Sequence, residues 1–293
     1  MYELIQVTES AYYLDCPSKI GIVKVGEDEV VLIDSGKDRS AAKKARAVLD
    51  GQGWRLRAIY NTHSHADHIG GNKYLIEQTG CPVFAYGIEQ DFTRHTILEP
   101  SLLFGACPPS ALRSKFLLAE ESAAQPLTED SLPKNIKLIE LRGHSPDMVG
   151  FKSDDGALFI ADSLSSAETL EKYGVGYIYD IGKYIETLKL LPSLEAKIYI
   201  PSHAAPTENI APLAELNLGK TLEIIDIIRG ICDTPSGQDD ILKAIMDHFG
   251  LTLTTEQYAL VGSTLRSYIS YLYDLGELGA VIEDNRLLWV RTK

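Results

Sequence analysis

The sequence is short of cysteine, of long apolar runs and of basic residues, and each shortage excludes a class of protein. Its four cysteines form no Cys-x-x-Cys pair, which excludes a zinc module built on cysteine ligands. Its longest apolar stretches, such as Val30–Ile33, fall far short of the roughly 20 residues that a membrane-spanning helix needs. The first residues do not join a basic segment to an apolar one, so we expect no export signal, a cytoplasmic location and reduced thiols.

Lysine and arginine number 28 against 41 aspartates and glutamates, a formal net charge of −13. Because nucleic-acid binding depends on basic side chains that neutralise phosphates, this balance argues against a nucleic-acid partner. A hydrophobic fraction of 45% and a charged fraction of 24% are ordinary globular values, which excludes disordered and collagen-like chains. The length of 293 residues suits one large domain with a small appendage.

Strand-like runs alternate with helical stretches over residues 1–210. Helices are predicted at Ser40–Leu49 and Ile69–Gln78. Apolar runs bounded by Gly, Pro or Asp predict strands at Val30–Ile33, Ala58–Tyr60, Pro82–Tyr86, Ile136–Leu141, Leu158–Ile160 and Lys197–Ile200. Strands interleaved with helices imply sheets with helices packed on their outer faces, so we expect an α/β (α+β) catalytic domain here.

The segment 90–134 breaks this alternation. It contains prolines and apolar residues without a clean period, and a segment of that length between two strands is more typical of a lid-like insertion than of a connector. We expect Phe104 and Phe116 to form an apolar wall of the substrate pocket. The alternative is that the side chains of this segment pack against the C-terminal part of the chain or against a second subunit.

Residues 211–293 have a different pattern. Helices at Leu216–Gly230, Asp239–Phe249 and Leu260–Leu275 precede a hairpin, an order that is typical of a winged-helix-like module. From Gly219 onward, seven Lys or Arg face eleven Asp or Glu, the wrong sign for a phosphate-binding surface. We therefore expect this module to pack on the catalytic domain or to form a homodimer contact.

The chemistry is concentrated in Thr62-His63-Ser64-His65-Ala66-Asp67-His68, directly after a predicted strand. His63 and His65 can share one metal ion, while Asp67 and His68 are displaced toward a second. Imidazole and carboxylate without thiolate suit Zn²⁺, and also Mn²⁺ or Fe²⁺.

Two ligands do not complete a tetrahedral site, so other segments must contribute. His144, Asp162 and His203 each follow a predicted strand, in Gly143-His144-Ser145, Ala161-Asp162-Ser163 and Ser202-His203-Ala204. Loops at one edge of a layered sheet converge on one side of it, where the site of an α/β protein is expected.

In their order along the chain, these motifs resemble those of the metallo-β-lactamase superfamily, over about residues 10–205. The resemblance implies a four-layer αββα sandwich with a dinuclear metal site. It implies that His63, His65 and His144 hold one ion. Asp67, His68 and His203 would hold the other, with Asp162 bridging the two. Flavodiiron relatives commonly have Glu at the position of His65, so the histidine favours two zinc ions and hydrolysis. The sequence departs from the family at Pro146-Asp147-Met148 and at Ala204, which affects the substrate pocket rather than the ligands.

Further residues are expected around these ligands. Asp34, in Ile33-Asp34-Ser35-Gly36, resembles the family's first motif and is expected to fix the metal loop rather than to bind metal. Asp67 is expected to orient the nucleophile, and Tyr177 could donate a hydrogen bond to a substrate oxygen.

Two adjacent cations lower the pKa of a bridging water until hydroxide exists near neutral pH. We therefore expect a hydrolase that attacks a small ester, thioester or lactone. One alternative is an endoribonuclease or phosphodiesterase with the same fold. A second is a glyoxalase II-like thioesterase, although the sequence has no evident basic cluster for glutathione.

Overall fold

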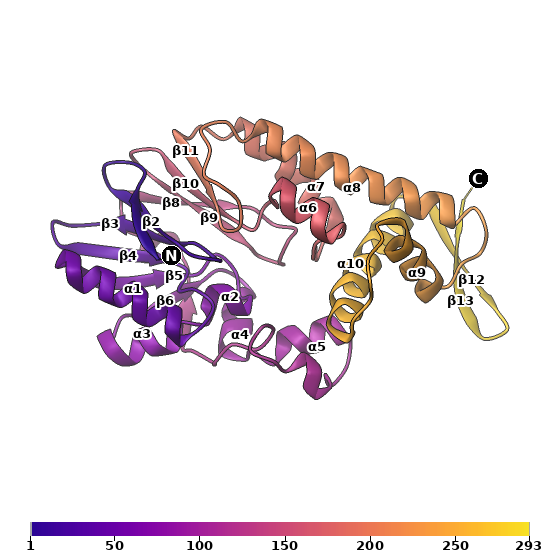
Figure 1. Ribbon diagram of the computed structural model, residues 1–293, viewed down its shortest axis with the longest axis horizontal. Coiled ribbons are helices and arrows are strands. Elements are labelled where there is room, and N and C mark those ends of the chain that lie inside the picture. Colours follow the sequence, from indigo (N-terminus) through magenta and orange to yellow (C-terminus); the bar gives the residue numbers. More distant parts are fainter. Residues whose placement is uncertain (1, 293) are drawn as a thin grey trace.

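The structure, a computed structural model, describes residues 2–292 and contains two facing β-sheets with helices on both outer sides (Figure 1). The first sheet has seven strands in chain order, antiparallel from β1 to β4 and parallel from β4 to β7. Its strands are β1 (Glu3–Gln6), β2 (Ala11–Asp15), β3 (Ile20–Lys24), β4 (Glu29–Ile33), β5 (Arg55–Tyr60), β6 (Val83–Ala85) and β7 (Ala124–Pro126).

The second sheet has four strands in the order β11-β10-β9-β8, parallel only between β10 and β11. These strands are β8 (Ile136–Glu140), β9 (Val149–Ser153), β10 (Ala157–Ala161) and β11 (Ile198–Pro201). Side chains from both sheets meet in one buried cluster that includes Val31 and Tyr60 from the first and Phe151 and Phe159 from the second. The predicted αββα sandwich is confirmed.

Helices cover the outer face of each sheet. On the first sheet, α1 (Arg39–Gln52) buries Ala42, Ala45 and Leu49 against apolar strand residues, and it packs beside α3 (Asn72–Thr79). On the second sheet lie α7 (Ile181–Leu190) and α8 (Ala211–Ile231), with α6 (Ala167–Tyr173) against α8. The helix predicted within Ile69–Gln78, after the Gly70-Gly71 turn, is confirmed as α3, and the short α2 (Ala66–Ile69) precedes that turn.

The segment 90–134 is not wholly an insertion. It includes α5 (Leu98–Phe104) and β7, the edge strand of the first sheet, and α4 (Glu89–Arg94) begins just before it. Short 3₁₀ turns occur at Ser110–Leu112 and Glu129–Ser131.

The C-terminal module consists of α8, α9 (Gln238–His248), α10 (Thr255–Asp274) and a hairpin of β12 (Leu278–Glu283) and β13 (Arg286–Arg291). An isolated bridge joins Ser236, between α8 and α9, to Trp289 on β13. One apolar cluster runs from the second sheet through α7 and α8 to α10, so the module packs on the sandwich (Figure 1). The domain boundary at residue 210 stays a prediction, and so does the winged-helix-like character of the module. Among residues 2–292, no helix combines the length and apolar character that crossing a bilayer requires.

Candidate metal centre

The polar residues expected to form the site all follow strand ends. Asp34 follows β4, His63 follows β5, Asp162 follows β10 and His203 follows β11, while His144 lies in the loop after β8. Because β4 and β5 are parallel, as are β10 and β11, the carboxyl ends of each pair lie at one edge of their sheet. The structure brings all seven predicted metal ligands together at this edge.

Three histidines form the first group. The Nε2 atom of His63 lies 3.1 Å from Nδ1 of His65, and Nε2 of His144 lies 3.0 Å from the same atom. Since a neutral imidazole has one N–H group, such a convergence of ring nitrogens suits a cation better than mutual hydrogen bonds. These three side chains are close enough to hold one ion.

The second group contains Asp67, His68 and His203. Nε2 of His203 lies 3.3 Å from Oδ2 of Asp67, and Nε2 of His68 lies 3.6 Å from that oxygen. Asp162 lies between the groups: its carboxylate oxygens are 3.3 Å from His68 Nε2, 3.2 Å from His203 Nε2 and 3.6 Å from His144 Nε2. Its position therefore allows contact with an ion in either group.

Buried polar atoms in the cluster lack hydrogen-bond partners. Within residues 2–292, Nε2 of His68 and Oδ1 of Asp162 are fully enclosed and make no hydrogen bond. Leaving such atoms unpaired is costly, and buried polar groups in proteins are normally satisfied. Both atoms are good donors to a divalent cation, so the residues present fit a metal centre.

Hydrogen bonds to the far side of each ring determine which nitrogen faces the centre. Nδ1 of His144 donates to the Tyr177 carbonyl at 3.0 Å, and Nδ1 of His203 donates to the Pro17 carbonyl at 2.9 Å. Each neutral ring therefore presents the lone pair of Nε2 to the cluster. Support of this kind is the usual arrangement around metal-binding histidines.

Asp34 orients His68 directly and His63 through Thr62. Its Oδ2 atom accepts from His68 Nδ1 at 2.8 Å and from the Thr62 hydroxyl at 2.7 Å, while its Oδ1 accepts from the Thr62 amide at 2.8 Å. Thr62 Oγ1 in turn lies 2.9 Å from His63 Nδ1, which donates to it. Asp34 has a φ of +63°, a left-handed conformation that Asp tolerates better than most residues. Asp34 thus contacts the outer side of the His68 ring and is not itself in a group that could hold a metal ion.

Replacing Asp34 with asparagine is expected to weaken metal binding by about 10- to 100-fold, the usual cost of losing a carboxylate behind a ligand histidine. An asparagine side chain has one acceptor oxygen where the carboxylate has two, so it cannot accept from both His68 and Thr62 as Asp34 does. The His68 ring then loses the hydrogen bond that fixes its tautomer. Competition with a chromophoric chelator measures the change. Asp38→Asn, at the N-cap of α1, is the control. Equal metal affinity for Asp34→Asn and the wild type would show that Asp34 has no part in positioning the loop.

The two groups differ in charge. Burial and neighbouring imidazoles hold the pKa of His63 well below its usual 6.5, and burial lowers the pKa of His65 to about 3. In the second group, Asp162 raises the pKa of His203 to about 10. Burial opposes charge on His68, but Asp162, Asp67 and Asp34 outweigh it and raise the pKa of His68 well above the usual value. Without metal, the second group therefore holds protons that a cation must displace.

Comparison with known proteins assigns the family. A model described as the metallo-beta-lactamase superfamily matches residues 14–203. The chain belongs to the metallo-β-lactamase superfamily. The two curated relatives described next are named hydrolases, and together with the family they support a metal-dependent hydrolase.

Two curated relatives are similar to this chain in sequence. A hydroxyacylglutathione hydrolase of Methylococcus capsulatus is 30% identical over 168 residues, which cover 55% of this chain and 54% of that protein. The chain thus spans about half the length of that relative. The probable metallo-hydrolase YybB of Bacillus subtilis is 28% identical over 204 residues, covering 67% of this chain and 87% of that protein.

Solved structures show the fold of the whole chain. A beta-lactamase domain protein from Burkholderia ambifaria has a TM-score of 0.74 at 16% identity, covering 99% of this chain and 94% of that one. The metallo-beta-lactamase DIM-1 has a TM-score of 0.57 at 17% identity and covers 75% of this chain and 97% of its own. The Burkholderia structure therefore matches the C-terminal module of this chain as well as its sandwich.

The sequence analysis missed Glu89, at the start of α4. Its buried carboxylate accepts from the amide and hydroxyl of Ser64 at 2.9 and 2.6 Å, from the Asp147 amide at 3.0 Å and from the Ser145 hydroxyl. Glu89 thereby joins the loop of His63 to the loop of His144. A single glutamate has no spacing signal, and only the burial of an acidic residue within α4 could have drawn attention to it.

Two glycines allow the metal loops to approach their neighbours. A Cβ atom on Gly71, after α2, would lie 2.3 Å from the Ser35 carbonyl oxygen. At Gly143, where φ is +125°, a Cβ would lie 2.3 Å from the Tyr184 amide nitrogen. Any other residue at either position would push a ligand loop away from the backbone that supports it.

A cavity of about 310 Å³ opens from His144, Asp162 and His203 toward the C-terminal module. Tyr177 lines it and meets the rings of His65 and His144 edge-on, with centroids 5.3 and 5.8 Å apart. Tyr177 thus lies beside two ligand histidines, and its hydrogen bond to a substrate stays a prediction.

Phe104 and Phe116 require a correction, because neither lines this cavity. Their side chains are 43% and 75% exposed, whereas Leu103, Leu112 and Leu117 of the same segment are buried with Ala259 of α10. Arg266 of α10 also donates to the Leu103 carbonyl at 2.9 Å. The segment packs against the C-terminal module, and the helix turn that buries Leu103 directs Phe104 outward.

Proposed function

We propose that the protein hydrolyses a small ester, thioester or lactone with two metal ions held by the cluster. The observation that carries this proposal is the pair of ligand groups joined by Asp162, which opens directly into a cavity of small-molecule size. Cavities for small ligands have volumes of about 300–1,000 Å³, so this one is at the small end.

In this proposal, His63, His65 and His144 hold one ion, and Asp67, His68 and His203 hold the other, with Asp162 shared. The ligand set of imidazole and carboxylate suits zinc, with Mn²⁺ or Fe²⁺ as alternatives. Bound there, divalent cations supply a nucleophile at neutral pH and polarise the acyl oxygen.

Asp67 is the residue we assign to the attacking water. Its Oδ2 atom faces His68 and His203 and accepts from the Ser18 hydroxyl at 2.6 Å, which fixes the carboxylate. No hydrogen bond from residues 2–292 reaches its Oδ1. That oxygen can orient a water molecule and accept its proton. The water oxygen bonds to the acyl carbon, the bond to the leaving sulfur or oxygen breaks, and the leaving group takes up the proton.

The alternative of an endoribonuclease or phosphodiesterase finds less support. Apart from the ligand histidines, the basic side chain that lines the cavity is Lys220, whose Nζ lies 2.5 Å from Glu223 Oε2. A polyanion would meet a chain of net charge −13 with little to neutralise its phosphates.

The names of several relatives favour a glutathione thioester as a second candidate. A thioester of that kind presents carboxylates, which basic side chains would have to bind. Because Lys220 is paired with Glu223, the proposal includes thioesters generally rather than the glutathione conjugate alone.

A panel assay of zinc-loaded protein tests the function. It contains an acyl thioester, a p-nitrophenyl ester, a lactone, a glutathione thioester, bis-p-nitrophenyl phosphate and an RNA oligonucleotide. We expect kcat/KM to be highest for one of the uncharged acyl substrates. Cleavage of the RNA or the phosphodiester alone would replace the proposal with its alternative.

Metal uptake should release protons at neutral pH. The pKa of His203 is about 10 without metal, so His203 is protonated at pH 7 and must lose that proton to bind an ion. Because protons compete with metal below the raised pKa, affinity of the second group should rise by at least about tenfold per pH unit between pH 6 and 8.

Calorimetry in two buffers of different ionisation enthalpy counts the protons released. His203→Ala should release fewer protons per chain than the wild type, whereas His248→Ala, at an exposed helix end, should release the same number. Uptake of metal without proton release would contradict the assignment of His203 as a ligand.

A further inference from the structure

We propose that Tyr268 of α10 binds an uncharged oxygen at the far end of the substrate, so that the cavity selects acyl groups bearing a hydroxyl or carbonyl away from the reacting carbon. This inference rests on the proposed function, because it concerns the same cavity. It assigns the C-terminal module a specific part in substrate choice.

The cavity has a reactive end and a distal end. At the reactive end are the ligand residues His144, Asp162 and His203, and at the distal end are α8 and α10, which contribute Ile224 and Tyr268. Between these two ends, the walls of the cavity include Leu164, which precedes α6, and other apolar side chains from α6 and from the loop that follows it. An apolar chain attached to the acyl carbon would therefore extend toward α10.

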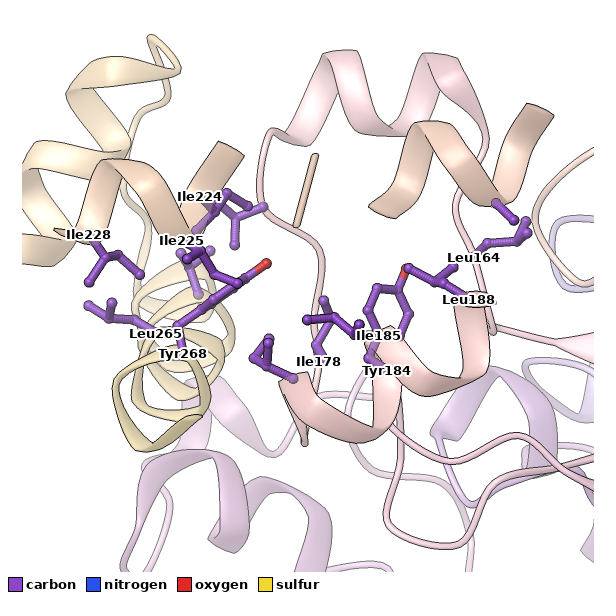
Figure 2. Packing of buried hydrophobic residues seen from close by; sticks show 14 of the residues in the cluster. Leu164, Ile178, Tyr184, Ile185, Leu188, Ile224, Ile225, Ile228, Leu265 and Tyr268 are labelled. Carbon is purple, nitrogen blue, oxygen red and sulfur yellow. The ribbon is translucent and has the colours of Figure 1, made fainter. Parts of the chain in front are cut away.

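Tyr268 contributes an enclosed polar group without a partner at the distal end of this cavity. The side chain is only 1% exposed, and within residues 2–292 its hydroxyl makes no hydrogen bond. Figure 2 shows its phenol reaching from α10 past Ile225, with the hydroxyl directed into the space that separates it from Tyr184 on α7. A buried hydroxyl is normally bonded, so a ligand atom is the expected partner.

The other polar groups at this end already bond to one another. Asn217 accepts from the Tyr184 hydroxyl at 3.2 Å and from the Ser165 amide at 2.8 Å, and its amide group donates to the Ser165 carbonyl at 2.9 Å. Thr221 donates to the Asn217 carbonyl at 2.9 Å. The Tyr268 hydroxyl is therefore the fully enclosed group at this end that makes no hydrogen bond of ordinary geometry within residues 2–292, with the Thr221 side chain near it.

The charge at this end indicates an uncharged partner. Lys220 lines the cavity, but its ammonium is paired with Glu223 and lies 4.9 Å from the Phe249 ring centroid. A carboxylate or phosphate would lack a cation to compensate its burial. Burial also raises the pKa of the Tyr268 phenol, which keeps it a hydrogen-bond donor. A hydroxyl or carbonyl oxygen is the acceptor that fits.

The experiment compares N-acetylcysteamine thioesters of octanoate with those of hydroxy- and oxo-octanoates, the oxygen placed at each carbon from the third to the eighth. For wild-type protein we expect one position to raise kcat/KM above that of octanoate. Tyr268→Phe should reduce this preference, the ratio of kcat/KM for the oxygenated chain to kcat/KM for octanoate, by about five- to tenfold, the effect of one neutral hydrogen bond. Tyr273→Phe, at an exposed position of α10, should behave as the wild type.

Binding of the corresponding octanamides to metal-free protein, measured by calorimetry, separates the two proposals. If no ester, thioester or lactone is hydrolysed but an oxygenated amide binds about five- to tenfold tighter to wild type than to Tyr268→Phe, the proposed function fails and the subsite stands. If thioesters are hydrolysed but Tyr268→Phe treats plain and oxygenated chains as the wild type does, the subsite is overturned and the function stands.

Discussion

Replacing Asp162 with alanine is expected to weaken both metal ions together and to lower kcat/KM by more than about a hundredfold. Its carboxylate lies within 3.6 Å of ring nitrogens from both ligand groups, so neither ion keeps its full set without it. Losing a group behind a ligand costs about 10- to 100-fold, and a shared ligand should cost more. Metal content after equilibrium dialysis, determined by mass spectrometry, measures the effect.

His203→Ala provides the contrast, because His203 contacts only the second group. It should lose about one ion while retaining the other, since His63, His65 and His144 remain intact. Asp154→Ala, which removes an exposed carboxylate from the turn before β10, is the control and should leave both ions bound. Native affinity for both ions in Asp162→Ala would refute its shared position.

Glu89→Ala is expected to reduce the free energy of unfolding by about 3–5 kcal/mol, because it leaves buried donors of Ser64, Ser145 and Asp147 without an acceptor. The loss should be accompanied by weaker metal binding, since Glu89 joins two ligand loops. Urea unfolding of the metal-free protein measures the stability.

Glu89→Gln keeps the volume of the side chain and can be measured in place of Glu89→Ala if the alanine variant does not fold. Its amide presents hydrogens toward hydroxyl and amide donors, so it should fall between wild type and Glu89→Ala in stability and in metal affinity. Glu77→Gln, on the exposed side of α3, should match the wild type in both. Unchanged metal affinity in Glu89→Gln would show that the hydrogen bonds of Glu89 stabilise the fold and do not affect metal binding.

The metal loop was predictable because its signal is local. Thr62–His68 follows a strand whose apolar run is evident, and the residues after β8, β10 and β11 follow the same rule. Parallel strands bring such ends together whatever the intervening sequence does. The strand pattern predicted sheets covered by helices, and the four-layer sandwich came from the family resemblance, because β9, with its Gly150 and Lys152, gave no clear alternating pattern.

Contacts between distant segments were not predictable. Phe104 and Leu103 are equally apolar in sequence, and only the packing of α5 on α10 determines that Leu103 is buried and Phe104 exposed. The same holds for Tyr268, whose place in the cavity depends on how α8 and α10 cross. Periodicity assigns a face to a helix but does not identify what that face meets.

The most direct test of the proposed two-ion hydrolase is a zinc titration of metal-free protein, with bound zinc and thioester hydrolysis followed together. We expect two zinc ions per chain, with hydrolysis rising until the second is bound, and about one ion and no measurable activity in His63→Ala. Saturation at one ion per chain, or full hydrolysis by the metal-free protein, would contradict the account.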